Sequence, residues 1–503
     1  MKSFRFNNSV VSDVLEEIKK AEEFIKIAIF QIHLEELFNI LEEKRVNEGV
    51  EIDIFTLPFD SINDSVREDV VTRLNRLSDL GINIYFCKWN VGDPERTSTA
   101  IGRWYSYHGK FIVTDKSAII LSANFTRSDE LDAALFIENE QTFIDNFKQK
   151  FYELQDLFII EQEGYNGKIR REIINTGLDN IENIFELPNV IETTTHQNHW
   201  IKHYPAKLCP DNIDIEEKLY LAPFNVKARK IYEKLLNQAE KYIYISAESF
   251  TDVEFALFLR QLKIKKDIDI CLLAGFTSMD FSDRIQKMYR ELIANDIKLY
   301  TIEEDLHAKL IITDKHLLIG SINLNKMNLG FNKTKKYWRE NTETFFISSN
   351  DTVIQDAKNK FLHQISNSLT MESKLAEKVQ KEVTEILNKS FNIKVRKEVK
   401  ELFSKFILIK EIEVKKDANK LAKITKKLMK HYDVKIANKD TFIMAIILFY
   451  LQDRKHTLSE IRNKLNKIEI IDNLNVLIEK LNNSDFVELD EDFYKIKIES
   501  LFE

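Results

Sequence analysis

The stretch "HGKFIVTD" at residues 108–115 decides how this chain is interpreted, because "HAKLIITD" repeats its pattern at residues 307–314. In both copies a lysine follows the histidine two positions later, and an aspartate ends the stretch. A serine and an asparagine then follow, with seven residues from aspartate to serine and sixteen from histidine to asparagine in both copies. Such matched spacings indicate an internal duplication. Its candidate site residues are His108, Lys110, Asp115, Ser122 and Asn124 in one copy and His307, Lys309, Asp314, Ser321 and Asn323 in the other.

The duplication extends to the strands that surround the motif. Apolar stretches of strand length recur in the same order in both halves, and amphipathic helical patterns separate them. Strands that alternate with helices predict an α/β fold with a mostly parallel sheet in each half. Each half then closes with an amphipathic helix, so we expect two repeats at residues 1–160 and 219–370. The matched strands are 24–32 with 242–250, 50–57 with 268–275, and 81–86 with 296–301.

The remaining segments have a different character. Residues 161–218 have weak periodicity and predict a linker or insert. Its histidines (His196, His199 and His203) suit a metal site or, as the interpretation we favour, a loop beside the site. Residues 371–436 predict a helical region rich in lysine and glutamate. Residues 437–503 predict three helices and then a strand–turn–strand, a pattern that resembles a winged-helix domain, with "TLSE" at 457–460 as a helix-capping box.

Composition limits the classes of protein to consider. The chain has 503 residues, of which 44% are hydrophobic and 31% charged, as in globular proteins. Its longest apolar run, residues 442–451, is half the length of a membrane-spanning helix and predicts a buried core helix. The start of the chain lacks a signal-peptide pattern, and three cysteines are too few and too scattered for a disulfide framework. We therefore expect a cytoplasmic protein without a membrane partner.

The motif residues suit chemistry at a phosphodiester. Histidine and lysine two positions apart on a strand point to the same face. A phosphodiester reaction needs a nucleophile, cations for the non-bridging oxygens and an acid for the leaving oxygen. One motif supplies one histidine and one lysine, so two motifs that meet across a pseudo-two-fold axis supply the full set.

The paired motifs resemble the signature of the phospholipase D superfamily. The resemblance implies a sandwich of two α/β repeats and a covalent phosphohistidine formed by one of the two motif histidines. The other histidine would protonate the leaving group and then activate water or another alcohol. The lysines, with Asn124 and Asn323, would hold the phosphoryl oxygens, and Ser122 and Ser321 would assist by hydrogen bonding. The resemblance implies no metal and no cofactor.

The family also places a carboxylate before the next apolar strand to fix a histidine ring. Glu343 matches this position in the second copy, and the shorter Asp132 matches it in the first. Leu121 stands where the second copy has Gly320, so the first motif is the less regular one. The aspartates that end the two motifs are expected to brace neighbouring backbone more than to touch phosphate.

Two segments rich in basic and aromatic residues, 87–107 and 330–340, flank the motifs and favour nucleic acid as substrate. Together with the resemblance, which implies independence from metal, these segments predict a nuclease, with DNA favoured over RNA. The resemblance to such two-part bacterial nucleases also permits a place in a restriction or anti-phage system. The alternatives are a phospholipase D or transphosphatidylase acting on lipids, and a non-catalytic scaffold. Residues 381–430 carry 15 Lys/Arg against 7 Asp/Glu in a chain of net charge −8. This excess suits contact with DNA, whereas the arginine-free helix pattern near residues 471–483 favours a protein partner for the tail.

Overall fold

The computed structural model divides into two compact units. The first contains residues 1–280 and 292–369, and the second contains residues 281–291 and 370–503. Both large sheets belong to the first unit, and each unit is described by itself. The described residues are 1–57, 64–87, 89–90, 104–105, 107–157, 160–161, 173–174, 214–222, 227–275, 283–302, 305–329, 341–386, 397–409, 414–452, 456–466, 471–484, 486–490 and 493–497.

The first repeat forms a nine-stranded sheet in the order β1-β9-β8-β7-β2-β3-β4-β10-β11. The motif strand β7 lies at its centre, between β8 and β2. The bounds are β1 Lys2–Asn7, β2 Phe24–Ile29, β3 Glu51–Thr56, β4 Asn83–Cys87, β7 Lys110–Thr114, β8 Ser117–Leu121, β9 Asp132–Glu138, β10 Ile160–Glu161 and β11 Ile173–Ile174.

The second repeat forms an eight-stranded sheet in the order β12-β18-β17-β16-β13-β14-β15-β19. Its first seven strands correspond one by one to the first seven of the other sheet, with the motif strand β16 at the position of β7. This correspondence confirms the duplicated α/β architecture. The bounds are β12 Leu219–Ala222, β13 Tyr242–Ala247, β14 Asp269–Ala274, β15 Lys298–Thr301, β16 Leu310–Thr313, β17 Leu317–Gly320, β18 Glu343–Ser348 and β19 Leu369–Thr370.

The expectation of mostly parallel sheets is wrong. Strands β2, β3 and β4, and their counterparts β13, β14 and β15, run parallel to one another. From β2 through β7, β8 and β9 to β1, every neighbouring pair is antiparallel, and the second sheet repeats this pattern. The reason is local: a turn of two or three residues joins each motif strand to the next, and so short a connection permits only a hairpin.

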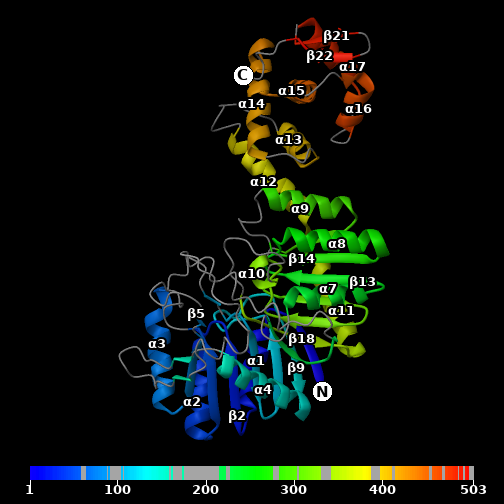
Figure 1. The fold of residues 1–503 in the computed structure, drawn as a ribbon. Helices are drawn as coiled ribbons and strands as arrows, with labels where there is room; N and C mark the ends of the chain where they lie inside the picture. Colours follow the sequence, from blue (N-terminus) through cyan, green and yellow to red (C-terminus); the bar gives the residue numbers. More distant parts are fainter. Residues whose placement is uncertain are drawn as a thin grey trace, which may run out of the picture. The chain divides into compact units, whose positions relative to one another are not determined.

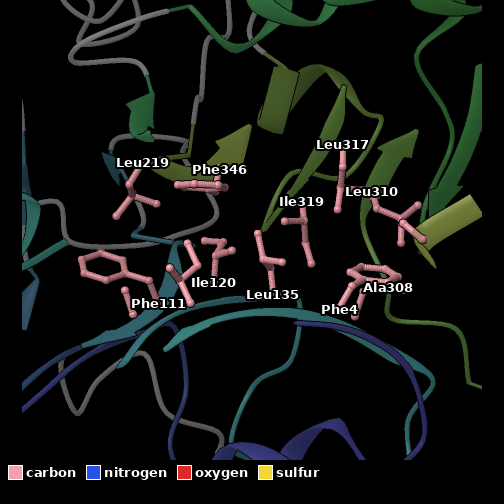
Figure 2. Packing of buried hydrophobic residues seen from close by; sticks show 14 of the residues in the cluster. Phe4, Phe111, Ile120, Leu135, Leu219, Ala308, Leu310, Leu317, Ile319 and Phe346 are labelled. Atoms are coloured by element: carbon pink, nitrogen blue, oxygen red, sulfur yellow. The ribbon is translucent and has the colours of Figure 1, made fainter. Parts of the chain in front are cut away.

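One hydrophobic core contains side chains from both sheets. Phe111 and Leu135 of the first sheet and Ile319 and Phe346 of the second belong to it, and Figure 2 shows these side chains gathered between the two repeats. Helix α4 (Gln141–Leu157) packs on β7 and β8 and also on β12, whereas α11 (Asp351–Ser366) packs on β16 and β17 and also on β1. The closing helix of each repeat therefore also contacts the other repeat, which makes the two repeats one folding unit.

Helices complete the layers of the first unit (Figure 1). A second core joins α1, α2 and α3 to one face of the first sheet. Helix α8 begins at Asp252, whose carboxylate accepts hydrogen bonds from the backbone N–H groups of Glu254 and Phe255 and so caps the helix. The bounds are α1 Val10–Lys19, α2 Glu35–Asn47, α3 Asp64–Asp79, α7 Ala228–Gln238, α8 Val253–Lys266 and α10 Lys326–Leu329. Helix α9 (Asp283–Ala294) belongs mostly to the second unit.

The second unit is helical with a small three-stranded sheet. The apolar run predicted as a core helix forms α15, buried throughout from Thr441 to Leu451. The capping box is also present: Thr457 N–H donates to Glu460, and Glu460 N–H donates to the Thr457 hydroxyl. The bounds are α12 Met371–Glu385, α13 Lys397–Ile409, α14 Val414–His431, α15 Lys439–Leu451, β20 His456–Thr457, α16 Leu458–Asn466, α17 Leu474–Asn483, β21 Val487–Asp490 and β22 Phe493–Ile496.

The three helices and the hairpin expected after residue 437 are thus present, while the assignment to the winged-helix class stays a prediction. Several other expectations lie outside the described residues. These are the histidines of the 161–218 segment, the segment 330–340, and most of the segment 87–107.

Candidate active site

The two motif histidines lie just before β7 and β16, and each is held by backbone of the other repeat. His108 N–H donates to the Thr342 carbonyl oxygen (2.7 Å), immediately before β18. His307 N–H donates to the Leu131 carbonyl oxygen (3.0 Å), immediately before β9. Isolated β-bridges at Tyr107 and Leu131 add further backbone pairing between the two repeats. The half-sites are therefore interlocked by the chain itself, before any side chain is considered.

The carboxylates that fix the histidine rings are exchanged in the same way. Glu343 Oε2 lies 3.0 Å from His108 Nδ1, and Asp132 Oδ1 lies 2.9 Å from His307 Nδ1. The sequence matched Glu343 to the second copy and Asp132 to the first, and the structure pairs each with the histidine of the opposite copy. Both carboxylates are fully or almost fully buried. Each histidine therefore carries its Nδ1 hydrogen toward a carboxylate and presents Nε2 for chemistry.

Hydroxyl and amide groups hold these carboxylates in turn. Ser122 Oγ donates to Asp132 (2.8 Å), and Ser321 Oγ donates to Glu343. The motif serines thus contact the carboxylates that orient the rings. Sequence reasoning did not identify Asn328, whose amide donates to the second oxygen of Glu343. Asn328 lies on the short helix α10, where no periodic pattern singles it out.

The motif lysines are buried beside the histidines. Lys110 Nζ lies 2.9 Å from the His108 carbonyl oxygen and 3.4 Å from His108 Nε2. Burial and the nearby Lys309 ammonium lower the pKa of Lys110 to about 7. Lys309 Nζ lies 2.6 Å from the His307 carbonyl oxygen. Two cations in one buried region repel each other, and an anion between them would relieve that repulsion.

Glu248, at the end of β13, is a site residue that sequence reasoning missed. Its Oε2 lies 2.7 Å from Lys309 Nζ, 3.1 Å from Asn323 Nδ2 and 3.5 Å from His307 Nε2. Burial alone would raise the pKa of Glu248, but the charges of Lys309 and His307 outweigh burial and hold that pKa well below its usual range. The carboxylate is therefore ionised and joins the second half-site.

The asparagines and the aspartates of the two motifs lie in different surroundings. Asn124 and Asn323 occupy equivalent positions, one after each motif. In the described part of the chain, the side-chain oxygen of each is buried without a hydrogen-bond partner. Asp115 and Asp314, included among the catalytic candidates, lie at the far ends of the motif strands. Each carboxylate accepts two backbone hydrogen bonds from the loop before a neighbouring strand, from residues 22 and 23 and from residues 240 and 241. They brace the sheet, since a strand of this length separates them from the histidines by roughly 20 Å.

The described residues contain one cluster with metal-ligand potential, in which ligand atoms of Glu130, Asp132 and His307 lie within 4.8 Å of one another. Asp132 Oδ1 is already at hydrogen-bond distance from both Ser122 Oγ and His307 Nδ1. A cation would have to replace those bonds. The expected independence from metal stays a prediction, tested below with a chelator.

Known proteins resemble this chain in sequence and in structure. A cardiolipin synthase from Clostridium perfringens is 23% identical over 336 residues, which span 65% of this chain and 63% of the relative. The match thus leaves more than a third of that relative uncovered. Among solved structures, phosphatidylserine synthase from Haemophilus influenzae Rd KW20 has a TM-score of 0.46 at 12% identity, covering 74% of this chain and 87% of that one.

A second solved structure is the phospholipase D family member Nuc from Salmonella typhimurium. It has a TM-score of 0.26 at 18% identity and covers 31% of this chain and 97% of its own. No helix among the described residues is both long and apolar enough to cross a membrane. The family model described as "Cardiolipin synthase, PLD-like domain" matches residues 14–155 and 232–365, one match in each repeat. Since these matches cover more than half of the chain, the protein belongs to the phospholipase D superfamily.

Proposed function

We propose that the protein transfers or hydrolyses phosphodiesters through a covalent phosphohistidine, with His108 as nucleophile and His307 as general acid and base. The observation that carries this proposal is the exchanged pairing of the two histidines with Glu343 and Asp132 beside two buried lysines. Each carboxylate fixes one ring, and the lysines supply the charge that two non-bridging oxygens need.

The assignment of roles follows from what surrounds each Nε2 atom. Burial, with the charges of Lys110 and Lys309, lowers the pKa of His108. Its Nε2 faces the Lys110 ammonium, which is a donor, so this nitrogen carries a lone pair and no hydrogen. His307 instead has a carboxylate near each ring nitrogen. Both nitrogens can donate at once only in the imidazolium form, which is the form a general acid requires.

The reaction then has two balanced steps. His108 Nε2 attacks phosphorus, the bond from phosphorus to the leaving oxygen breaks, and His307 gives its proton to that oxygen. His307, now neutral, takes a proton from water or an alcohol. The resulting oxygen nucleophile attacks phosphorus, and the phosphorus–nitrogen bond breaks. The choice of water or alcohol decides between hydrolysis and transfer.

We propose a phosphatidyl lipid as the substrate. The matching family model and the curated relative both bear the name cardiolipin synthase, which favours the lipid alternative over the nuclease expected from the sequence. A nuclease is the second candidate, because the segments 87–107 and 330–340 combine basic and aromatic residues next to the motifs. The lysine-rich residues 381–430 would then contact the nucleic acid, or the tail would dock a protein partner.

The test is a parallel assay of the purified full chain in excess EDTA. One arm contains phosphatidyl lipid vesicles with glycerol as acceptor, and the other contains single-stranded DNA, duplex DNA and RNA. We expect turnover of the lipid, loss of turnover in both His108→Ala and His307→Ala, and a covalent phosphohistidine in wild-type enzyme quenched with denaturant at alkaline pH, where the phosphorus–nitrogen bond survives, that is absent from His108→Ala. Cleavage of nucleic acid without lipid turnover would establish the second candidate. Activity that EDTA removes and Mg²⁺ restores would reject the histidine route.

A further inference from the structure

The two half-sites differ at one position next to the phosphate-binding groups. The strand registers align β2 with β13, since Ile25 pairs with Thr114 of the first motif and Ile243 pairs with Thr313 of the second. Five residues further along each chain, Phe30 corresponds to Glu248. One half-site therefore has an aromatic ring where the other has a carboxylate.

The aromatic ring leaves the first half-site open to an anion. The Phe30 ring centroid lies 4.8 Å from that of His108 and 5.5 Å from Lys110 Nζ. It packs against the edge of the imidazole and offers the lysine only a π-face. A ring brings no negative charge, so the cation of this half-site keeps its capacity to bind a phosphoryl oxygen.

In the second half-site, a carboxylate already contacts the groups that would bind the phosphoryl oxygen. A single oxygen, Glu248 Oε2, is in reach of Lys309 Nζ, Asn323 Nδ2 and His307 Nε2. These three groups are the ones that the proposed reaction uses to hold and to protonate the phosphodiester. Glu248 Oε2 thus stands where a non-bridging phosphoryl oxygen would bind. Its side chain is 38% exposed, whereas that of Lys309 is 1% exposed, so the glutamate can turn toward solvent while the lysine stays.

We propose that Glu248 is a specificity-determining residue, an internal competitor that admits the singly charged phosphate of a diester and disfavours the doubly charged phosphate of a monoester. This inference rests on the proposed phosphodiesterase function of the same site. A phosphate that displaces Glu248 from Lys309 remains near its negative charge. The repulsion scales with the charge of the ligand, so a dianion experiences twice the penalty of a monoanion.

The experiment compares a diester and a monoester on the full chain near neutral pH. The substrate is bis(4-nitrophenyl) phosphate, a monoanion, and the competitor is phenyl phosphate, a dianion because the second pKa of a phosphate monoester is about 6. Glu248→Gln keeps the shape of the side chain and removes its charge. Glu130→Gln is the matched control, because it removes a carboxylate 3.9 Å from His307 on the Nδ1 side of the ring.

We expect Glu248→Gln to lower the KM of the diester about threefold and the Ki of phenyl phosphate about tenfold. The dianion experiences twice the free-energy penalty of the monoanion. The ratio of its binding constants between wild type and Glu248→Gln is therefore the square of the ratio for the monoanion. Glu130→Gln should change both constants less than about twofold. Equal changes in KM and Ki, or weaker binding of phenyl phosphate by both Glu248→Gln and Glu248→Ala, would overturn the proposal. Weaker binding would mean that Glu248 merely positions Lys309.

The outcomes also separate this inference from the proposed function. An active wild-type enzyme whose Glu248→Gln variant keeps both constants would refute the role of Glu248 alone. Diester turnover that persists in His108→Ala would refute the proposed function. Titration calorimetry with phenyl phosphate measures the same affinity ratio without turnover, so a slow substrate does not leave the role of Glu248 undecided.

Discussion

At the scale of single residues, the exchanged carboxylates are the feature with the clearest consequence. Glu343 raises the pKa of His108, while burial, the larger effect, lowers it. We expect Glu343→Gln to lower the pKa of His108 further. Nitrogen-detected NMR on protein labelled at its histidine rings measures this pKa. An unchanged pKa of His108 would contradict the pairing of Glu343 with the histidine of the opposite copy.

A second prediction concerns the buried ammonium of Lys110. Its pKa is about 7 in the folded protein, against an ordinary value of 10.5. Below pH 7 both the folded and the unfolded states are protonated, and the folded state bears the full penalty of a buried charge. Between pH 7 and 10.5 the folded state has lost the proton that the unfolded state keeps, so the penalty shrinks and stability rises with pH.

Lys110→Met should therefore increase the free energy of unfolding by roughly 2–5 kcal/mol at pH 6, less the hydrogen bond lost at the His108 carbonyl. The gain should disappear near pH 10.5. Urea unfolding of the variant and the wild type across this range measures the difference. A gain that is constant with pH would show that packing, and not the charge, is responsible.

The residue scale also shows where sequence reasoning ends. The histidines, lysines and asparagines were predictable because the duplication places each of them twice at one spacing. Glu248 was not predictable, because its counterpart in the first copy is Phe30. A comparison of the two copies finds only residues that occur in both. The exchange of Glu343 and Asp132 was hidden for another reason: a motif defines sequence neighbours, and only tertiary structure decides which histidine each carboxylate meets.

At the scale of elements, the antiparallel pair of strands β17 and β18 positions Glu343. A Cβ atom on Gly320 would collide with the Thr344 carbonyl oxygen and would lie 2.6 Å from Phe345 Cβ. The same backbone holds Ser321, whose N–H donates to Thr344 (2.9 Å). Glycine is therefore required where the strands approach closely, which gives a structural reason for the mismatch with Leu121 in the first copy.

Gly320→Ala should force β18 away from β17, lower the free energy of unfolding by about 1–3 kcal/mol and reduce turnover by displacing Glu343. The matched control is Leu121→Ala, at the equivalent position of β8, where a side chain is already accommodated. That change should destabilise by loss of apolar burial without displacing a strand. Denaturation and kcat together check both variants, and a Gly320→Ala protein with wild-type turnover would contradict the role of this strand pair.

Strand order illustrates the same division between what was predictable and what was not. Apolar runs and helical periods predicted the strands and their duplication. The predicted strand direction was wrong because strands and helices alternate early in each repeat, and the parallel direction that this alternation predicts was extended to the motif hairpin. Only the short connection after each motif strand, at residues 115–116 and 314–316, carries the information that the chain turns back after β7 and β16.

At the scale of the whole molecule, both half-sites belong to one unit and one core. Phe111 and Leu135 of the first sheet pack in the same cluster as Leu310 and Phe346 of the second. The closing helices also contact the sheet of the opposite repeat. Separation of the repeats would expose this core, so exchange of a repeat between two chains would be costly. The site should therefore be complete within a single chain.

This arrangement predicts that two inactive variants cannot rescue each other. Equal amounts of His108→Ala and His307→Ala, mixed or co-expressed, should give no more activity than either variant alone. The specific activity of the wild type should also stay constant on dilution. The control is a mixture of wild type with either variant, which should retain activity in proportion to the wild-type chains. Activity restored in the mixed variants would show that one chain supplies His108 and another supplies His307, which would require the shared core to open and the repeats to exchange.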